Sequence, residues 1–261
     1  MPVMSSPSVL VVALLGAVAG ALAVRPGHRL AVPYGEPPRG ACGACAAPLP
    51  AGARGWWGVA CRRCRTRLGA PWWLTATVGA AAGGVVGWAL APVGTGPTLV
   101  VSLLVLGAGT VMVVVGLLLA VIDLAAHRLP DPIVARLAVA ELGLLIAAAA
   151  TGAGWAPLER AVLGGLVMAG AYLVLALLPG ANLGLGDVKL SAVLGLSLGW
   201  FGWPTLLLGA VLPHLLNGPV ALSLLLRGKA SRHTELPLGP ALLAGWLLAV
   251  AAHAWADLPA G

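Results

Sequence analysis

Two aspartates stand at the ends of long apolar segments, where ionisable side chains are rare. Asp123 lies in the segment VIDL (121–124), and Asp187 lies in GLGDVK (184–189). A carboxyl group at such a position is costly and usually functional. Two carboxylates that share a proton supply an acid and a base at one pH, so they can activate water and protonate the departing amine of an amide. We therefore predict that Asp123 and Asp187 are catalytic, with Gly184, Gly186 and Lys189 as substrate-binding or supporting residues.

Either aspartate alone also has an ordinary interpretation, as a helix cap or an interfacial anchor. Asp187 opens a predicted helix and Asp123 lies near the end of one, so the helix dipoles predict that Asp123 is the more readily protonated member. Asp131 is interpreted as the cap of the next helix. Glu141, inside that helix, is interpreted as structural, with a supporting role near the aspartates as the alternative.

All four cysteines fall in one polar insertion. They form two Cys-x-x-Cys pairs, Cys42 with Cys45 and Cys61 with Cys64, and fifteen residues separate the pairs. This spacing is typical of a zinc ribbon, in which four thiolates hold one tetrahedral ion. A reducing compartment disfavours the alternative of two disulfides. We predict a structural Zn²⁺, because a site closed by four sulfur ligands leaves no open position for hydrolysis.

The composition is that of a membrane protein. Of the 261 residues, 60% are hydrophobic and only 9% are charged, whereas a soluble domain carries about 25% charged residues. The net charge of +7 does not indicate nucleic acid, because the basic residues lie in short loops between apolar segments. That placement favours anionic headgroups and membrane orientation instead.

Apolar segments long enough to cross a bilayer, about 20 residues each, occur about eight times along the chain. They must be helical, because unpaired backbone groups in hydrocarbon are too costly. The predicted fold is all-α, a polytopic membrane protein with a small zinc-ribbon-like loop on the cytoplasmic side. The predicted spans are residues 5–24, 72–91, 98–122, 132–150, 160–178, 188–203, 205–226 and 237–256.

The basic residues predict the orientation. With the N-terminus outside, the inner segments 25–71, 127–136, 179–189 and 227–236 hold 14 of the 15 Lys and Arg residues, and only Arg160 lies outside. This is a strong positive-inside bias, and it puts both aspartates on the inner side. Residues 1–7 lack the basic flank of a signal peptide. We divide the chain into a first helix (1–24), a zinc-binding loop (25–71) and a transmembrane core that carries the aspartates (72–261).

These motifs together resemble the type IV prepilin leader peptidases, membrane aspartyl proteases of the GxGD class. The tetracysteine loop follows the first span, Asp123 precedes the LPD segment 129–131 at the family's interval, and GLGDVKL (184–190) matches the second aspartate motif position by position. LPLGP (236–240) is similar to the family's entry into the last span. The resemblance extends over most of the chain.

The resemblance implies cleavage of a short basic leader from type IV prepilins or type II secretion pseudopilins, at the cytoplasmic face of a bacterial inner membrane. It maps Asp123 and Asp187 onto the catalytic pair and the four cysteines onto the zinc ligands. Many family members also N-methylate the new amino terminus with S-adenosylmethionine. Segments 20–24 and 69–73 depart from the family's pattern, so the resemblance supports proteolysis better than methylation. The rival interpretation is a proton-coupled transporter that uses the two aspartates as a relay.

Overall fold

The computed structural model describes residues 7–50, 52–178, 183–226 and 237–257. Over these residues every long element is a helix, which confirms the expected all-α fold. The helices are α1 (Pro7–Leu30), α2 (Trp72–Ala89), α3 (Pro97–Ala126), α4 (Asp131–Ala148), α5 (Trp155–Leu177), α6 (Leu185–Phe201), α7 (Trp203–Leu226) and α8 (Gly239–Ala256). A π-helical turn, Ala149–Ala153, continues α4, and a short 3-10 turn, Ala53–Trp56, lies in the loop after α1.

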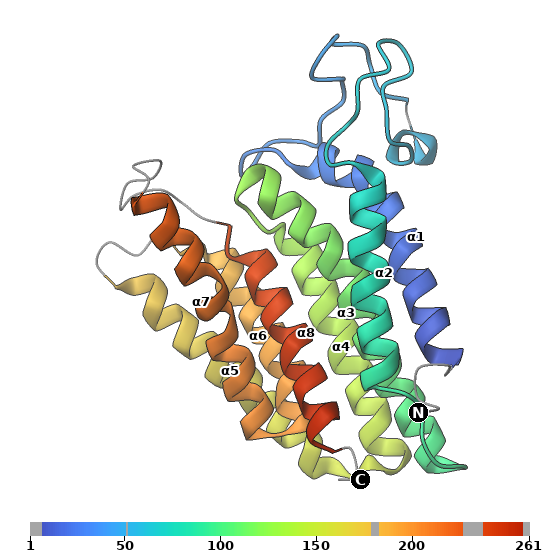
Figure 1. Ribbon diagram of the computed structural model, residues 1–261, viewed down its shortest axis with the longest axis vertical. Helices are drawn as coiled ribbons and strands as arrows, with labels where there is room; N and C mark the ends of the chain where they lie inside the picture. Colours follow the sequence, from blue (N-terminus) through green and yellow to red (C-terminus); the bar gives the residue numbers. More distant parts are fainter. Residues whose placement is uncertain (1–6, 51, 179–182, 227–236, 258–261) are drawn as a thin grey trace.

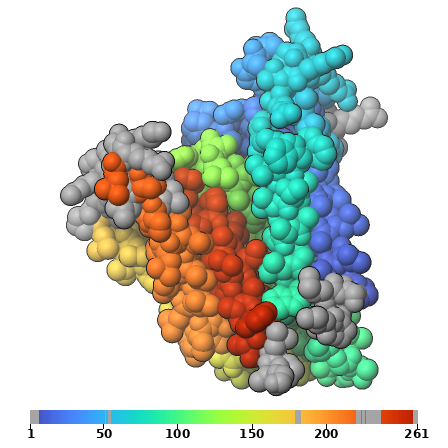
Figure 2. Space-filling model, viewed as in Figure 1, coloured from blue at the N-terminus to red at the C-terminus, as the bar shows by residue number. Residues whose placement is uncertain are grey.

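The helices form one bundle and run alternately up and down (Figure 1). Residues 31–71, which we call the cysteine module, project from one end of it, and we call that end the module end (Figures 1 and 2). The bundle core is aliphatic: Met112 and Leu119 of α3 and Leu190 of α6 have no more than traces of exposed surface. An apolar interior with an apolar exterior is expected of helices that lie in lipid.

Five helical segments are long and apolar enough to cross a membrane among the residues described, so the chain is a multi-pass membrane protein. They are α1, α3, α4 with its extension to Ala153, α5 and α8. The other three long helices, α2, α6 and α7, are too short or not apolar enough over their described residues to meet this criterion of length and composition. The eight expected segments are therefore all present as helices, and five of them qualify as spans by length and composition.

Glycines bring α1 and α2 into backbone contact. A Cβ added at Gly16 or Gly20 of α1 would collide with the main chain of α2 at Gly79 and Thr75, and one added at Gly83 would collide with α1 at Val12. Such close approach is how small residues join helices where no hydrophobic driving force acts between them. The pair holds both ends of the cysteine module, because α1 enters the module and α2 leaves it.

Several helix ends differ from the expectation, among them the ends of α1 and α3. The first helix runs six residues past position 24, through Pro26 to Leu30, and α3 continues to Ala126. The extension of α1 carries Arg25 and Arg29, which find hydrogen-bond acceptors in the cysteine module. The predicted helix ended before Arg25 because a charged residue is costly in lipid. In the structure the helix continues, because both arginines have hydrogen-bond partners.

Candidate active site

Both predicted aspartates line one cavity at the module end. The cavity has a volume of about 370 Å³ and takes its lining from the loop after α1, the α3–α4 turn and the start of α6. Asp123 belongs to the last turn of α3, and Asp187 to the first turn of α6. Because these two helices run in opposite directions, the end of one and the start of the other meet at the same depth.

Asp123 is almost fully buried, with 4% of its surface exposed. Its Oδ2 accepts a hydrogen bond of 2.9 Å from the main-chain N–H of Gly239. Gly239 is the first residue of α8, so its N–H is one of the donors that a helix start leaves without a partner. The dipoles of α3 and α6, the helices that carry the aspartates, were the basis for predicting the proton on Asp123. The start of α8 is a third helix end at this site, and it opposes the end of α3.

Asp187 is held by a short turn that begins at Gly184. Its main-chain N–H donates to the Gly184 carbonyl over 3.0 Å, and the Gly184 amide hydrogen-bonds the Asp187 carboxylate in return. The Asp187 carboxylate thus takes the place of the acidic residue of a capping box, although Gly184 has no side chain to cap the helix in return. The Oδ1 of Asp187 is buried and has no hydrogen-bond partner among the described residues. One oxygen of the carboxylate is thus fixed by the backbone, while the other has no partner among the described residues.

The two glycines before Asp187 allow close packing and do not relieve a strained backbone. Gly184 has an ordinary φ of −71°, and neither Gly184 nor Gly186 has a positive φ. A Cβ at Gly186 would lie 3.1 Å from the Cβ of Leu129 and 3.4 Å from its main-chain nitrogen. Gly186 therefore lets the turn that carries Asp187 rest directly on the turn that follows Asp123.

An ion pair joins the same two turns. Lys189 Nζ lies 2.8 Å from Asp131 Oδ1, and both side chains line the cavity and remain about half exposed. The interpretation of Asp131 as a helix cap was wrong, because α4 has Pro130 as its N-cap and no side-chain cap bond. Asp131 instead turns toward α6 and engages Lys189.

Glu141 lies deeper in α4. It has no exposed surface, and neither carboxyl oxygen has a hydrogen-bond partner among the described residues. It does not line the cavity of the aspartates. The structure therefore places it on the bundle-facing side of α4, as the structural interpretation expected, but without the polar partner that such burial normally requires.

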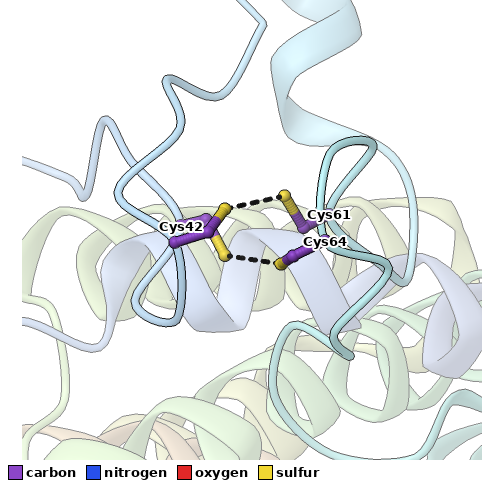
Figure 3. Close-up of side chains that lie close together, drawn as sticks. Cys42, Cys61 and Cys64 are labelled. Carbon is purple, nitrogen blue, oxygen red and sulfur yellow. Dashed lines mark hydrogen bonds between the residues drawn. The ribbon is translucent and has the colours of Figure 1, made fainter.

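The cysteine module brings all four sulfur atoms together. They lie within 4.8 Å of one another, with Cys42 Sγ 3.7 Å from Cys64 Sγ and Cys45 Sγ 3.7 Å from Cys61 Sγ (Figure 3). The cysteines are free, which excludes the two-disulfide alternative in this structure. A tetrahedral ion with Zn–S bonds of about 2.3 Å needs sulfurs about 3.8 Å apart. The four thiols therefore fit a structural zinc ion.

Each Cys-x-x-Cys pair sits on the same kind of turn. The N–H groups of Ala46 and Arg65 donate to the carbonyls of Cys42 and Cys61, and both donors adopt left-handed φ values of 55° and 58°. Antiparallel bridges between Ala41 and Pro48, and between Ala60 and Arg67, close the two turns. Two equivalent turns facing each other form the four-sulfur site, and Ala47, Leu49 and Leu68 pack with the cysteines in a small core of the module.

The thiols differ in acidity when no metal is bound. The Thr66 hydroxyl, 3.2 Å from Cys64 Sγ, can donate to its thiolate and lowers the pKa of Cys64 to about 6. The pKa of Cys61 is lowered by the backbone N–H groups of Cys64 and Arg63. For Cys45 the Ala47 amide acts in the same direction, but the neighbouring sulfurs outweigh it and raise the pKa to about 11. Zinc binding must therefore release protons.

Two arginines of α1 anchor the module. Arg25, 3% exposed, donates from Nη2 to the Ala60 carbonyl over 2.8 Å, and Ala60 directly precedes Cys61. Arg29 donates to the Gly55 carbonyl over 3.1 Å and lies 4.4 Å from the Trp56 ring. The module is thus tied to the helix that packs on α2 and α3.

Two contacts at the cavity could not be predicted from the sequence alone. No role was predicted for Gly239, although Gly-Pro at the start of a helix was a visible signal for an exposed N-terminal donor. Asp131 was also not paired with Lys189. Tyr34, from the loop after α1, lines the cavity as well, and no pattern around it indicated this.

Comparisons with known proteins agree with the resemblance. A family model described as the type IV leader peptidase family matches residues 110–218, a range that contains both aspartates but neither the cysteine module nor Gly239. A prepilin leader peptidase/N-methyltransferase of Pseudomonas putida is 35% identical over 147 residues, which cover 54% of this chain and 47% of the relative. The match thus spans about half the length of that curated relative. No solved structure matches the chain significantly. Over residues 110–218, this chain is similar to the type IV leader peptidase family.

Proposed function

We propose that this chain is a membrane aspartyl endopeptidase with Asp123 and Asp187 as its catalytic pair. The observation that carries the proposal is their shared cavity, which two helix ends and a glycine-packed turn hold in place. Two carboxylates in one small cavity cannot both ionise easily, so one proton is shared between them. The ionised carboxylate takes a proton from water as the water attacks the scissile carbonyl, and the protonated carboxyl gives its proton to the departing amine.

The oxygens have different surroundings, and this suggests separate tasks. The Gly239 N–H fixes Asp123 Oδ2, so that oxygen has a defined position. Asp187 Oδ1, which has no partner among the described residues, is the atom we assign to hydrogen-bond the attacking water. Gly186 and the ion pair of Asp131 with Lys189 act indirectly, because they hold the turn of Asp187 against the turn that follows Asp123.

For the substrate, we propose the leader peptide of a type IV prepilin or a type II secretion pseudopilin. The family match and the name of the Pseudomonas putida relative support this. Cleavage at the cytoplasmic face of a bacterial inner membrane is supported by the basic residues of the cysteine module and of the described turns around the cavity, Arg128 and Lys189 among them. A proton relay would need carboxylates distributed across the bilayer, and the two aspartates lie at one depth, so we favour the peptidase over the transporter.

The name of the relative also contains N-methyltransferase, which would require S-adenosylmethionine. A second cavity, which lies between α2, α3 and α8 and is lined by His28 and Arg39 near the cysteine module, does not fit that molecule. Among its described lining residues there is no carboxylate to hold the ribose hydroxyls or the amino group, and nearly all of the lining is apolar. The proposal is therefore confined to the peptidase reaction.

We further propose that Cys42, Cys45, Cys61 and Cys64 hold one structural Zn²⁺. The sulfur spacing supports this, and the bound ion would hold the two turns of the module together. Protein purified under reducing conditions should contain one zinc per chain, and Cys61→Ser should lose it. Metal-free wild-type protein would contradict the assignment.

The peptidase proposal is tested by co-expression with a prepilin and by following removal of the leader on gels. Asp123→Asn and Asp187→Asn should each abolish processing, because an amide can neither take up the proton from water nor return it to the amine. Asp257→Asn, the same change at the opposite end of the bundle, is the matched control and should process normally. Normal processing by either of the first two variants would refute the mechanism.

A further inference from the structure

A second and larger cavity lies beside the first. It has a volume of about 650 Å³ and shares no lining residue with the cavity of the aspartates. Its floor is the face of α3 from Met112 to Ala125, and its walls come from α2 and α8, which lie next to each other on the near face of the bundle (Figure 1). Leu74, Val78 and Leu124 of the lining are 44%, 49% and 59% exposed, so the cavity opens sideways toward lipid.

The charge of this cavity is one-sided. Its described lining contains Arg39 and His28 and no aspartate or glutamate. The Nε2 of His28 is buried and has no hydrogen-bond partner among the described residues. Both side chains lie at the module end, beside Gly69 and Ala70, while the rest of the lining is apolar apart from Thr75, whose hydroxyl already donates to the Trp72 carbonyl. The cavity thus has a cationic end and a long apolar body.

The apolar body of the cavity is elongated. Thirteen helical steps from Met112 to Ala125 make its floor about 20 Å long. An extended hydrocarbon chain can lie along this floor with a charged group at the cationic end.

We propose that this cavity is a binding site for an anionic phospholipid. One acyl chain lies along α3 between α2 and α8, and the phosphate lies at Arg39 and the Nε2–H of His28. Basic pockets between membrane helices on the cytoplasmic side are suited to anionic headgroups, and guanidinium groups bind phosphate with directed hydrogen bonds. Pro240 lines the cavity next to Gly239, so the bound lipid touches the helix start that holds Asp123.

Trp246 provides a direct probe, because it lines the cavity and is only 2% exposed. The full chain is placed in phosphatidylcholine nanodiscs with increasing fractions of phosphatidylglycerol brominated on its acyl chains, which quenches tryptophan on contact. The signal of Trp246→Phe is subtracted to isolate this residue. Quenching should saturate at a low fraction of brominated phosphatidylglycerol. Brominated phosphatidylcholine should reach the same quenching only at a higher fraction. Arg39→Gln should raise the half-saturating fraction about fivefold, as loss of one headgroup cation predicts.

Arg67→Gln is the matched control, since it removes the same charge from an exposed site of the module outside the cavity. The Trp246 indole donates a hydrogen bond to Ser197 Oγ, so Trp246→Phe can disturb the fold. Native mass spectrometry gives a second measurement that does not need this variant. Wild type and Arg67→Gln should retain phosphatidylglycerol on purification, and Arg39→Gln should lose it. Equal quenching by both lipids, unchanged in Arg39→Gln, would overturn the proposal. The proposal would also be overturned if an apolar helical peptide displaced the brominated lipid and the two lipids were bound equally well. Neither readout depends on peptidase activity.

Discussion

Gly239→Ala is the sharpest test of how Asp123 is positioned. The added Cβ would lie 2.8 Å from Asp123 Oδ2, 3.2 Å from its Cγ and 3.4 Å from its Cβ. Real Cβ atoms do not approach an oxygen so closely, so one of the two groups must move by about half an ångström. Asp123 is buried with 4% exposure, and it therefore cannot swing away freely.

The expected cost is to rate more than to stability. A displacement of about 1 Å in an active site costs on the order of 100-fold in rate, so half of that predicts a loss of about tenfold in kcat. The peptide N–H of residue 239 is retained, and alanine in a helix is favoured over glycine by up to about 1 kcal/mol. This gain offsets part of the roughly 1–3 kcal/mol that overpacking costs. The variant should therefore lose little stability while cleaving more slowly.

The assay is cleavage of a purified prepilin in proteoliposomes, with kcat and KM measured separately. Gly143→Ala is the matched control, since a Cβ there meets nothing within 4 Å, and its rate should equal that of the wild type. A wild-type kcat in Gly239→Ala would show that the contact with α8 does not position the reacting carboxylate. A change in KM alone would lead to the same conclusion.

Three further outcomes follow from the module and the ion pair. Arg25→Gln should weaken zinc binding about 10- to 100-fold in chelator competition, because residues that hydrogen-bond next to metal ligands contribute that much to affinity. An unchanged affinity would show that the bond from Arg25 to the Ala60 carbonyl does not position Cys61. In reduced, metal-free protein, the rate at which iodoacetamide modifies Cys64 should be half-maximal near pH 6, and Cys45 should react only at much higher pH, because their pKa values are about 6 and about 11. Mass spectrometry that finds Cys45 modified first would contradict this order of acidity. A double-mutant cycle on Asp131 and Lys189 should give a coupling below about 1 kcal/mol that shrinks in high salt, since both side chains are about half exposed; a coupling of several kcal/mol would show a desolvated pair.

Several features of the fold and site could be predicted from the chain alone. Apolar segments of bilayer length must be helices, because no other open structure satisfies its backbone in lipid. The two Cys-x-x-Cys pairs predicted the four-sulfur cluster, because that spacing forms the turn that presents two thiols together. The rarity of carboxylates in such a chain directed attention to Asp123 and Asp187, and both line the same cavity.

The surroundings of each aspartate could not be predicted in this way. The dipole argument for the proton on Asp123 used only α3 and α6, and the start of α8 adds an N–H donor from a residue 116 positions away. The proton assignment therefore stays a prediction whose basis the structure weakens. In the same way Asp131 had the position of a cap, yet the partner it finds is Lys189 on another helix.

The sequence by itself thus determined the kind of molecule and the residues able to do chemistry, because lipid solvation, Cys-x-x-Cys turns and scarce carboxylates act locally along the chain. Only the tertiary structure decided how those residues are held. Gly239 meets Asp123, Gly186 rests on Leu129, and Arg25 reaches the cysteine module, and each contact joins positions far apart in sequence. Such contacts depend on helix packing, in which close approach at small residues places one helix end against another. The packing turns Asp123 and Asp187 from two isolated acids into a pair.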